Sequence, residues 1–298
     1  MGKHSHAHTE AVTLSIAWAI LAAALYALSA PMSKLLLDCV PPTMMAAFLY
    51  LGAGSGMLVV GAVRRKVEKT PSERHLTRRD LPYAVGMIIL DIAAPIFLML
   101  GLSATASANV SLLNNFEIVA TSLVALLIFK EAISRRLWLA IGLITLSSVV
   151  LSVEDASSFQ FSGGSLLVLL ACACWGFENN CTRMMSGSDP LEIVVVKGFG
   201  SGIGSLLIAF AAGETMPNPG LIPAVLLLGF VSYGLSIFFY VYAQRRLGAA
   251  LTSAFYAVAP FIGVALSLVI FRELPGIRFF AALAMMAAGT YLAAVNAE

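Results

Sequence analysis

Charged residues are scarce in this chain: Asp, Glu, Lys and Arg make up 11% of its 298 residues, against about a quarter in a soluble domain. Hydrophobic residues make up 59%, and the mean hydropathy is +0.91. The charges lie mostly between long apolar runs, which excludes a soluble domain and predicts a polytopic helical membrane protein in a lipid bilayer. The one basic run is short and gives no support to nucleic-acid binding.

Histidine is absent from every apolar run, because the four histidines are His4, His6, His8 and His75. The usual general base and metal ligand are therefore missing from the membrane interior, and we expect neither an enzyme nor a metal site. Three of the four cysteines lie within one apolar run without the paired spacing of zinc sites, so we interpret them as small hydrophobic residues. The polar tail, residues 1–11, is expected to be disordered and cytoplasmic.

Ten apolar segments follow one another along the chain, and most have the roughly 17–25 residues that a bilayer helix needs. They are Val12–Leu37, Thr43–Val63, Leu81–Gly101, Thr105–Phe129, Leu137–Val153, Gly164–Met185, Leu191–Ala212, Ile222–Ala243, Ala250–Phe271 and Ile277–Val295.

The chain contains an internal repeat that covers nearly its whole length. Ser107–Glu131 (SANVSLLNNFEIVATSLVALLIFKE) reappears without gaps as Ala249–Glu273 (AALTSAFYAVAPFIGVALSLVIFRE), 142 positions later (273 − 131 = 142). Tyr26–Pro41 likewise aligns with Trp175–Pro190. Residues 12–153 and 164–298 therefore each form a five-helix repeat, and an odd number of helices gives the two repeats opposite orientations in the membrane. The fold predicted is an all-α polytopic membrane protein of ten transmembrane helices in two inverted five-helix repeats.

Glycines recur at spacings that let helices approach closely. Gly52 and Gly56 in the second segment, and Gly198 and Gly202 in the seventh, fit small-xxx-small packing. A nucleotide-binding loop is excluded at Gly198, since no strand precedes it.

The loop charges predict the orientation. Basic residues concentrate after the even-numbered second, fourth and eighth segments, and acidic residues lie mainly in the opposite loops. By the positive-inside rule both termini are cytoplasmic, in a cell (inner) membrane protein. The basic residues are Arg64, Arg65, Lys66, Lys69, Arg74, Arg78, Arg79, Lys130, Arg135, Arg136, Arg245 and Arg246.

Four ionisable side chains lie inside apolar segments: Asp91, Glu117, Glu178 and Lys197. Each costs about 2.5–3.5 kcal/mol to insert, so such residues mark function or are paired. Glu178 and Lys197 both lie seven residues from the same end of consecutive helices and are expected at similar depth, as an ion pair fixing a hairpin or as part of a substrate site. If they pair, Asp91 and Glu117 remain as unpaired acids near the centres of their helices.

The sequence around Glu117 carries further polar groups. Asn114, Glu117 and Thr121 share one face of a continuous helix by their spacing. The Asn and Glu side chains supply a donor and an acceptor suited to a polar substrate or a proton. The candidate substrate- or proton-binding residues are Glu117, Asn114, Asp91, Asn115, Trp175, Glu178, Lys197, Asn179 and Tyr256.

These motifs resemble the drug/metabolite transporter superfamily, specifically its EamA-type members. The matching features are Trp175-Gly176 with Arg183, their counterparts Tyr26 and Lys34, the closing Phe-Lys-Glu and Phe-Arg-Glu motifs, and Ala259-Pro260. The resemblance covers nearly the whole chain. It implies a 5+5 inverted repeat, a central cavity lined mainly by segments one, three, four, six, eight and nine, and export of small metabolites or drugs. Glu117 stands where many members are uncharged.

The sequence therefore favours a secondary transporter that exports a small polar or cationic metabolite or drug by alternating access. Glu117, with Asn114 and Asp91, would bind the cation or carry a coupling proton, and no other cofactor is expected. An excess of buried acids over bases motivates the cationic substrate. The alternatives are an exporter of neutral amino acids or other metabolites with structural buried charges, and a non-transporting membrane scaffold or sensor. The oligomeric state is left open.

Overall fold

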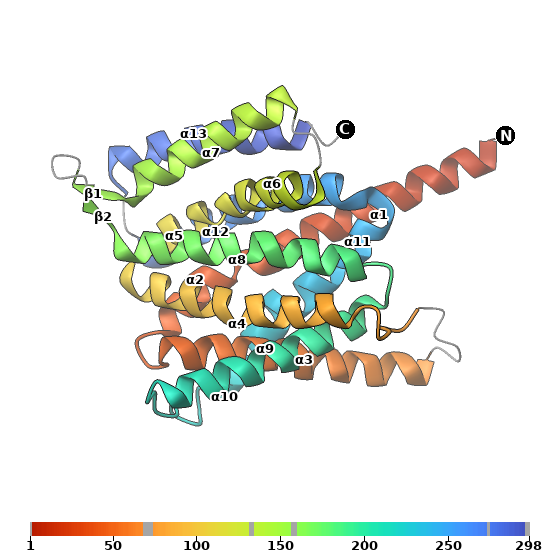
Figure 1. Ribbon diagram of the computed structural model, residues 1–298, viewed down its shortest axis with the longest axis horizontal. Helices are drawn as coiled ribbons and strands as arrows, with labels where there is room; N and C mark the ends of the chain where they lie inside the picture. Colours follow the sequence, from red (N-terminus) through yellow and green to blue (C-terminus); the bar gives the residue numbers. More distant parts are fainter. Residues whose placement is uncertain (1, 68–73, 131–133, 156–159, 273–274, 296–298) are drawn as a thin grey trace.

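The computed structural model describes residues 2–67, 74–130, 134–155, 160–272 and 275–295, which form a bundle of helices running along one axis (Figure 1). The elements, in chain order, are α1 (Gly2–Ala27), α2 (Ser29–Leu36), α3 (Pro42–Val67), α4 (Leu81–Ala104), α5 (Ser107–Leu113), α6 (Phe116–Phe129), α7 (Arg135–Ser152), β1 (Val153–Asp155), β2 (Gln160–Phe161), α8 (Gly163–Met185), α9 (Pro190–Ala211), α10 (Ile222–Gly229), the π-helical η1 (Phe230–Leu235), α11 (Ser236–Tyr256), α12 (Ala259–Phe271) and α13 (Ile277–Val295).

The predicted fold class is confirmed. Within the described residues, seven helical stretches are long and apolar enough to cross a membrane, and the apolar α12 and α13 are shorter. Helix α8 has 23 residues but is not among the seven, because Glu178, Asn179 and Asn180 lower the mean hydropathy of its second half. The sequence did not predict the two short strands, which pair antiparallel between the two halves.

Helices of one half pack on helices of the other. The most extensive contacts join α4 to α8, α3 to α9, α1 to α11 and α7 to α13, followed by α6 to α8 and α3 to α10, and α5 also packs on α12. This is the pairing that a two-fold relation between inverted halves produces. It also corrects one expectation: α8 packs mainly on α4 and α9 mainly on α3, so these consecutive helices do not form a closely packed hairpin.

Three of the ten spans break inside the bundle. The first breaks at Leu28, between α1 and α2, because Pro31 has no N–H to bond the carbonyl of Ala27 four residues earlier. The fourth breaks at Asn114–Asn115, where a continuous helix was predicted; the Asn115 amide donates to the Leu112 carbonyl (3.3 Å), which competes with helical bonding.

The ninth span breaks at Ala257–Val258, before α12, where Pro260 occupies one of the first two helical positions. The predicted loop between Ala243 and Ala250 is wrong: α11 continues as helix through this stretch, since it holds no proline. The boundary between the eighth and ninth spans is thus a helical segment.

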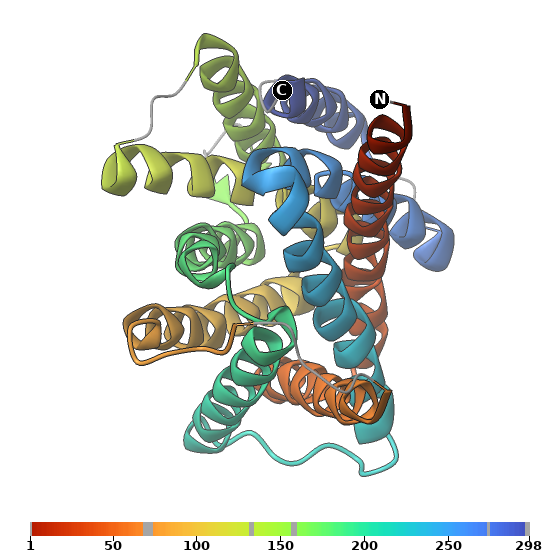
Figure 2. The same ribbon diagram turned by 90° about the vertical axis from the view of Figure 1, so that its right-hand side faces the viewer.

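Both termini lie at one end of the bundle, together with the end of α3 that carries Arg64 and Arg65 (Figures 1 and 2). This agrees with an even number of spans, while the cytoplasmic location of that end remains a prediction from the loop charges. The expectation of a disordered tail is wrong, because α1 begins at Gly2 and projects beyond the other helices. No residue between Gly2 and the apolar span breaks the helix, so helical structure propagates outward.

Glycines bring the backbone of α3 into contact with its neighbours, as their spacing predicted. A Cβ on Gly198 of α9 would lie 2.4 Å from the Gly54 nitrogen of α3. A Cβ on Gly52 would lie 2.1 Å from the Leu226 carbonyl oxygen of α10. Only hydrogen fits at these positions, so α3 is fixed between α9 and α10.

The basic residues of the two closing motifs terminate helices. Lys130, after α6, and Arg272, after α12, adopt the left-handed conformation with φ of 55° and 54°. The Arg272 N–H donates to the Leu268 carbonyl (3.0 Å), as is typical where an α-helix ends in a residue with left-handed backbone angles. These two closing motifs therefore end their helices at the basic residue; Glu131 and Glu273 lie outside the described residues.

Replacing Gly198 with Ala is expected to destabilise the protein by at least about 1–3 kcal/mol, because the new methyl group meets backbone that cannot rotate away. Thermal unfolding in detergent measures the effect. The control is Gly142→Ala in α7, where a Cβ meets nothing within 4 Å and helix propensity favours Ala by about 1 kcal/mol. Equal shifts for the two variants would show that the α3–α9 contact does not require glycine.

Replacing Arg272 with Gly is expected to leave stability unchanged or raise it by about 1 kcal/mol, because glycine adopts a positive φ without steric cost. Arg272→Val is expected to lower the melting temperature, since a β-branched residue is disfavoured there. The same thermal assay on both variants tests this. A destabilising Gly variant would mean that the Arg272 side chain, and not its backbone conformation, matters at this helix end.

Candidate functional site

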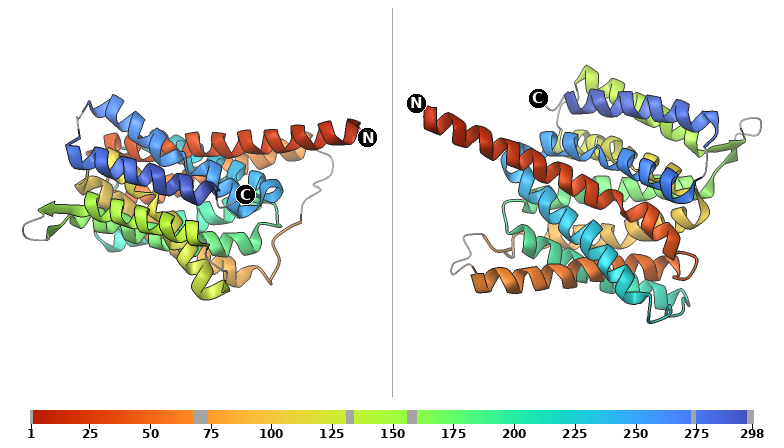
Figure 3. Two further views of the ribbon diagram at one scale, coloured as in Figure 1. Left: turned by 90° about the horizontal axis from the view of Figure 1, so that it is seen from above. Right: turned by 180° about the vertical axis from the view of Figure 1, so that it is seen from behind.

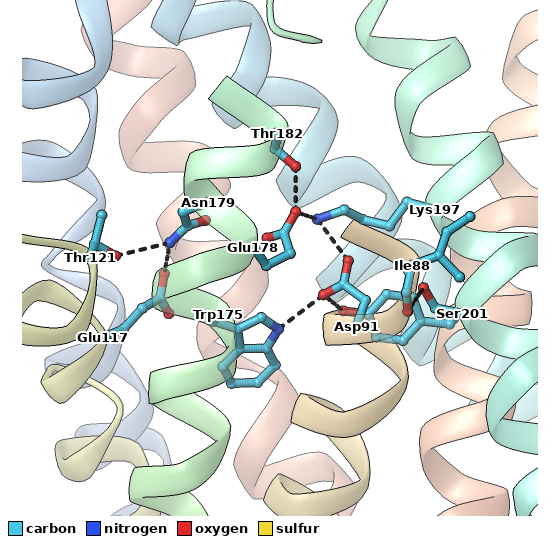
Figure 4. Close-up of polar contacts among 11 residues, drawn as sticks. Ile88, Asp91, Glu117, Thr121, Trp175, Glu178, Asn179, Thr182, Lys197 and Ser201 are labelled. Carbon is cyan, nitrogen blue, oxygen red and sulfur yellow. Dashed lines mark hydrogen bonds and ion pairs between the residues drawn. The ribbon is translucent and has the colours of Figure 1, made fainter. Parts of the chain in front are cut away.

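A buried ion-pair triad joins three helices in the middle of the bundle (Figure 4). The Lys197 ammonium on α9 lies 2.8 Å from Glu178 Oε1 on α8 and 3.0 Å from Asp91 Oδ2 on α4. The exposed fractions of Asp91, Glu178 and Lys197 are 0%, 2% and 4%. Charges that are this deeply buried require partners, and here one cation serves two carboxylates.

The other oxygen of Asp91 is also occupied. Its Oδ1 accepts hydrogen bonds from the Tyr50 hydroxyl (2.9 Å) and from the Trp175 indole N–H (3.2 Å). The expectation that Asp91 stays unpaired when Glu178 and Lys197 pair is therefore wrong. The reason is the packing of the helices: α4 contacts both α8 and α9, and Asp91 points at the same ammonium.

Glu178 has a second donor on its own helix. The Thr182 hydroxyl, one turn further along α8, donates to Glu178 Oε1, the oxygen that also faces Lys197. Thr182 and Tyr50 were not among the predicted site residues. The i, i+4 spacing of Glu178 and Thr182 could have indicated this hydrogen bond, because residues four apart on a helix are neighbours. Nothing in the sequence around Tyr50 indicated a polar partner.

Glu117 occupies a different environment on the other side of α8. It is the second residue of α6, so the break at Asn114–Asn115 places it at the N-terminus of a half-helix, where the helix dipole favours a negative charge. Glu117 Oε1 accepts from the Asn179 amide (2.6 Å), which also lies 3.4 Å from Thr121 Oγ1. Glu117 is half-buried, and no Lys or Arg of the described residues forms an ion pair with it.

The structure does not bring the predicted residues Asn114 and Asn115 to Glu117. Because the fourth span breaks, Asn114 does not share a helical face with Glu117; its Oδ1 lies 4.0 Å from Cys172 Sγ. Asn115 is buried and accepts from the Thr290 hydroxyl of α13 (3.3 Å). It therefore takes part in helix packing.

A small cavity lies where the broken spans meet. Polar groups in its wall include Tyr26, Asn114 and the buried Ser111, whose hydroxyl has no hydrogen-bond partner among the described residues. The Tyr26 ring packs against Trp175 and Tyr256, with centroids 6.4 Å and 5.8 Å away. Tyr26, Trp175 and Tyr256 thus form an aromatic cluster at the cavity.

Ten spans in inverted halves, with polar and ionisable residues buried at their centre, define a multi-pass membrane transporter. The EamA-like transporter family matches the chain twice, over residues 13–153 and 162–295. The protein belongs to this family and is not an enzyme, as the sequence motifs predicted.

Two further comparisons agree with this assignment. An uncharacterized transporter of Methanothermobacter thermautotrophicus is 26% identical over 273 residues, which are 85% of this chain and 78% of the relative. A solved crystal structure superimposes with a TM-score of 0.69 at 18% identity, covering 95% of this chain and 97% of that chain. The latter shows a shared fold.

Removing the triad cation alone is expected to be far more damaging than removing all three charges. Lys197→Met leaves two carboxylates buried without a cation, which typically costs about 3–5 kcal/mol. The triple variant Lys197→Met, Asp91→Asn, Glu178→Gln has no buried charge and is expected to recover most of that loss. Thermal unfolding and monodispersity of the purified variants test this. A triple variant as unstable as the single one would indicate that shape, and not charge balance, governs the triad.

Proposed function

We propose that this EamA-family protein is a secondary transporter that exports a small polar or cationic metabolite or drug by alternating access, with Glu117 as the group that binds the cation or a coupling proton. One observation carries the proposal. Lys197 forms ion pairs with both Asp91 and Glu178, whereas Glu117 has no cationic partner among the described residues and accepts from the neutral Asn179 amide. The negative charge of Glu117 is thus left for a ligand.

The position of Glu117 supports this role. It lies at a helix break and is half-buried, so it can lose or gain a small partner more readily than the fully buried Asp91. Asn179 orients the carboxylate, and the Tyr26 and Tyr256 rings supply aromatic faces that attract organic cations. The unpartnered Ser111 hydroxyl in the adjacent cavity offers a hydrogen bond to the polar part of a substrate.

Competition at Glu117 gives a simple coupling scheme. One carboxylate cannot hold a proton and pair with a cation at the same time. Release of the cation on one side of the membrane would be followed by protonation, and return of the protonated form would exchange protons for substrate. Alternating access then requires that Glu117 be reachable from one side at a time.

A neutral metabolite is the second candidate substrate, and the triad is the observation that favours it. Three of the four ionisable residues predicted for the site satisfy one another, as expected if buried charges are structural. The cavity wall itself, with Ser111 and Asn114, carries no charged side chain among the described residues.

Ligand-induced thermal stabilisation separates the two candidates. Purified protein is heated with quaternary ammonium compounds, polyamines, neutral amino acids and drugs from pH 5.5 to 8.5. A cationic ligand at 100 times its Kd is expected to stabilise wild type by about 2.7 kcal/mol, more strongly as pH rises because protons compete less. Glu117→Gln keeps the acceptor for Asn179 and is expected to lose this effect.

Asp38→Asn is the matched control, since it removes one exposed negative charge outside the helices of the site. It is expected to behave as wild type. Stabilisation by neutral or anionic compounds that is unchanged in Glu117→Gln would make Glu117 structural and favour the neutral substrate.

A further inference from the structure

Helix α2 is a short arm attached to the bundle through a proline-induced break. It has eight residues and follows the turn at Leu28, at the end of the bundle opposite to the termini (Figure 3). Pro31 cannot bond the carbonyl of Ala27. The repeat alignment places Asn180 at the equivalent position of α8, and there the Asn180 amide donates to the Gly176 carbonyl (2.8 Å). The same point of the repeat is therefore weakened in the first half and reinforced in the second.

Lys34 holds this arm against α4. Its ammonium donates to the carbonyls of Leu102 (2.6 Å) and Ser103 (3.2 Å) in the last turn of α4. The final carbonyls of a helix have no partner within the helix and carry its negative dipole, so a lysine is well placed there. The contact joins the arm to the rest of the bundle at its outer end, beyond the break.

The arm also covers the cavity. Ser29 and Ala30 of α2 form part of its wall, facing Ser111 of α5 and Gly263 of α12. Helix α2 contacts α5, α10 and α12 as well as α4. Moving α2 away from α4 would therefore open the cavity toward that end of the bundle.

The neighbouring pair α3 and α9 is tied at both ends. At the end near α2, both carboxylate oxygens of Glu214, beyond α9, accept from the backbone N–H groups of Thr43 (3.0 Å) and Met44 (2.8 Å), the free donors at the start of α3. At the opposite end, the Arg64 guanidinium of α3 lies 3.5 Å from the carboxylate of Asp189, the N-cap residue of α9. With glycine contacts between these two ties, α3 and α9 behave as one unit.

We propose that Lys34 is a positioning residue for transport: it latches α2 over the central cavity, and α2 swings about the break before Pro31 while α3 and α9 stay together. Lys34 touches no substrate in this scheme. It acts through the C-terminal carbonyls of α4, and breaking its hydrogen bonds to them opens the cavity at the end opposite to the termini. The inference does not depend on which substrate is carried.

Accessibility of the cavity tests the latch without a known substrate. The four cysteines are replaced with alanine, Ser111 is changed to Cys, and a charged maleimide labels this thiol in protein held in lipid nanodiscs. Lys34→Met is expected to raise the labelling rate by at least about tenfold, which is about the smallest effect expected from the loss of even one hydrogen bond to a charged group. Lys34→Arg can still donate to the carbonyls and is expected to stay near the parent rate. Pro31→Ala restores a helical donor and is expected to slow labelling.

Glu214→Gln is the matched control at the same end of the bundle, because it weakens the tie between α3 and α9. Its labelling rate is expected to lie within about twofold of the parent rate. An unchanged rate in Lys34→Met, or an equal rise in Glu214→Gln, would overturn the proposal. General unfolding of Lys34→Met is recognised by a lower melting temperature than that of the parent, which is measured for each variant alongside the labelling rate.

Discussion

The burial of the Lys197 ammonium between two carboxylates constrains the centre of this protein. In the interior of a lipid bilayer an unpaired charge is not hydrated and is therefore costly. Helices α4, α8 and α9 must for this reason meet where Asp91, Glu178 and Lys197 can form ion pairs. Tyr50 and Trp175 then satisfy the remaining oxygen of Asp91, which brings α3 to the same point. The helices that contain the fewest breaks are thus cross-linked through one buried polar network. The glycine contacts between α3 and α9 extend this rigid part along the bundle.

The broken spans surround this rigid part and carry the groups that we propose to be functional. Breaks at Leu28, Asn114–Asn115 and Ala257–Val258 expose helix ends inside the membrane, which lipid-facing helices cannot tolerate but cavity-lining helices can. Glu117 is at such an end, with its charge supported by the start of α6. A site at a helix break differs from the triad in a useful way: its partners are backbone dipoles and a neutral amide, so it can exchange a proton or a cation without leaving another charge unpaired.

Much of this fold was predictable from the sequence, for identifiable reasons. Hydropathy gave the spans, the repeat gave the inversion, and the scarcity of charge made the four buried ionisable residues conspicuous. Counting residues from the helix ends placed Glu178 and Lys197 at one depth, and they do pair. Asp91 joined them only because α4 packs against both α8 and α9, a long-range relation that no local pattern encodes. The same limit applies to Tyr50.

The helix breaks show where local signals were present and where they were ambiguous. Pro31 and Pro260 are sufficient to explain two of them. Asn114 and Asn115 are compatible with either a helix or a break, so the shared face of Asn114, Glu117 and Thr121 was a reasonable but wrong inference. The repeat supplies the missing information: the fourth and ninth spans break one residue apart in the alignment, although Pro260 has only Ile118 as its counterpart. The break therefore belongs to the architecture, and each half reaches it with different residues.

The two halves carry different residues at several aligned positions. Pro31 removes a helical hydrogen bond in the first half, and Asn180 adds one at the matching carbonyl of the second. Glu117 stands in the first half where the aligned residue of the second half is Ala259, which lines the cavity. A duplicated protein with two identical halves would have two identical gates and two identical sites. In the proposed scheme the first half contributes the hinge before Pro31 and the acid Glu117, and the second half contributes helix α8, which holds Glu178, Asn179 and Trp175. Asymmetry of this kind allows one end of the transporter to open by a different movement from the other, with the acid site between them.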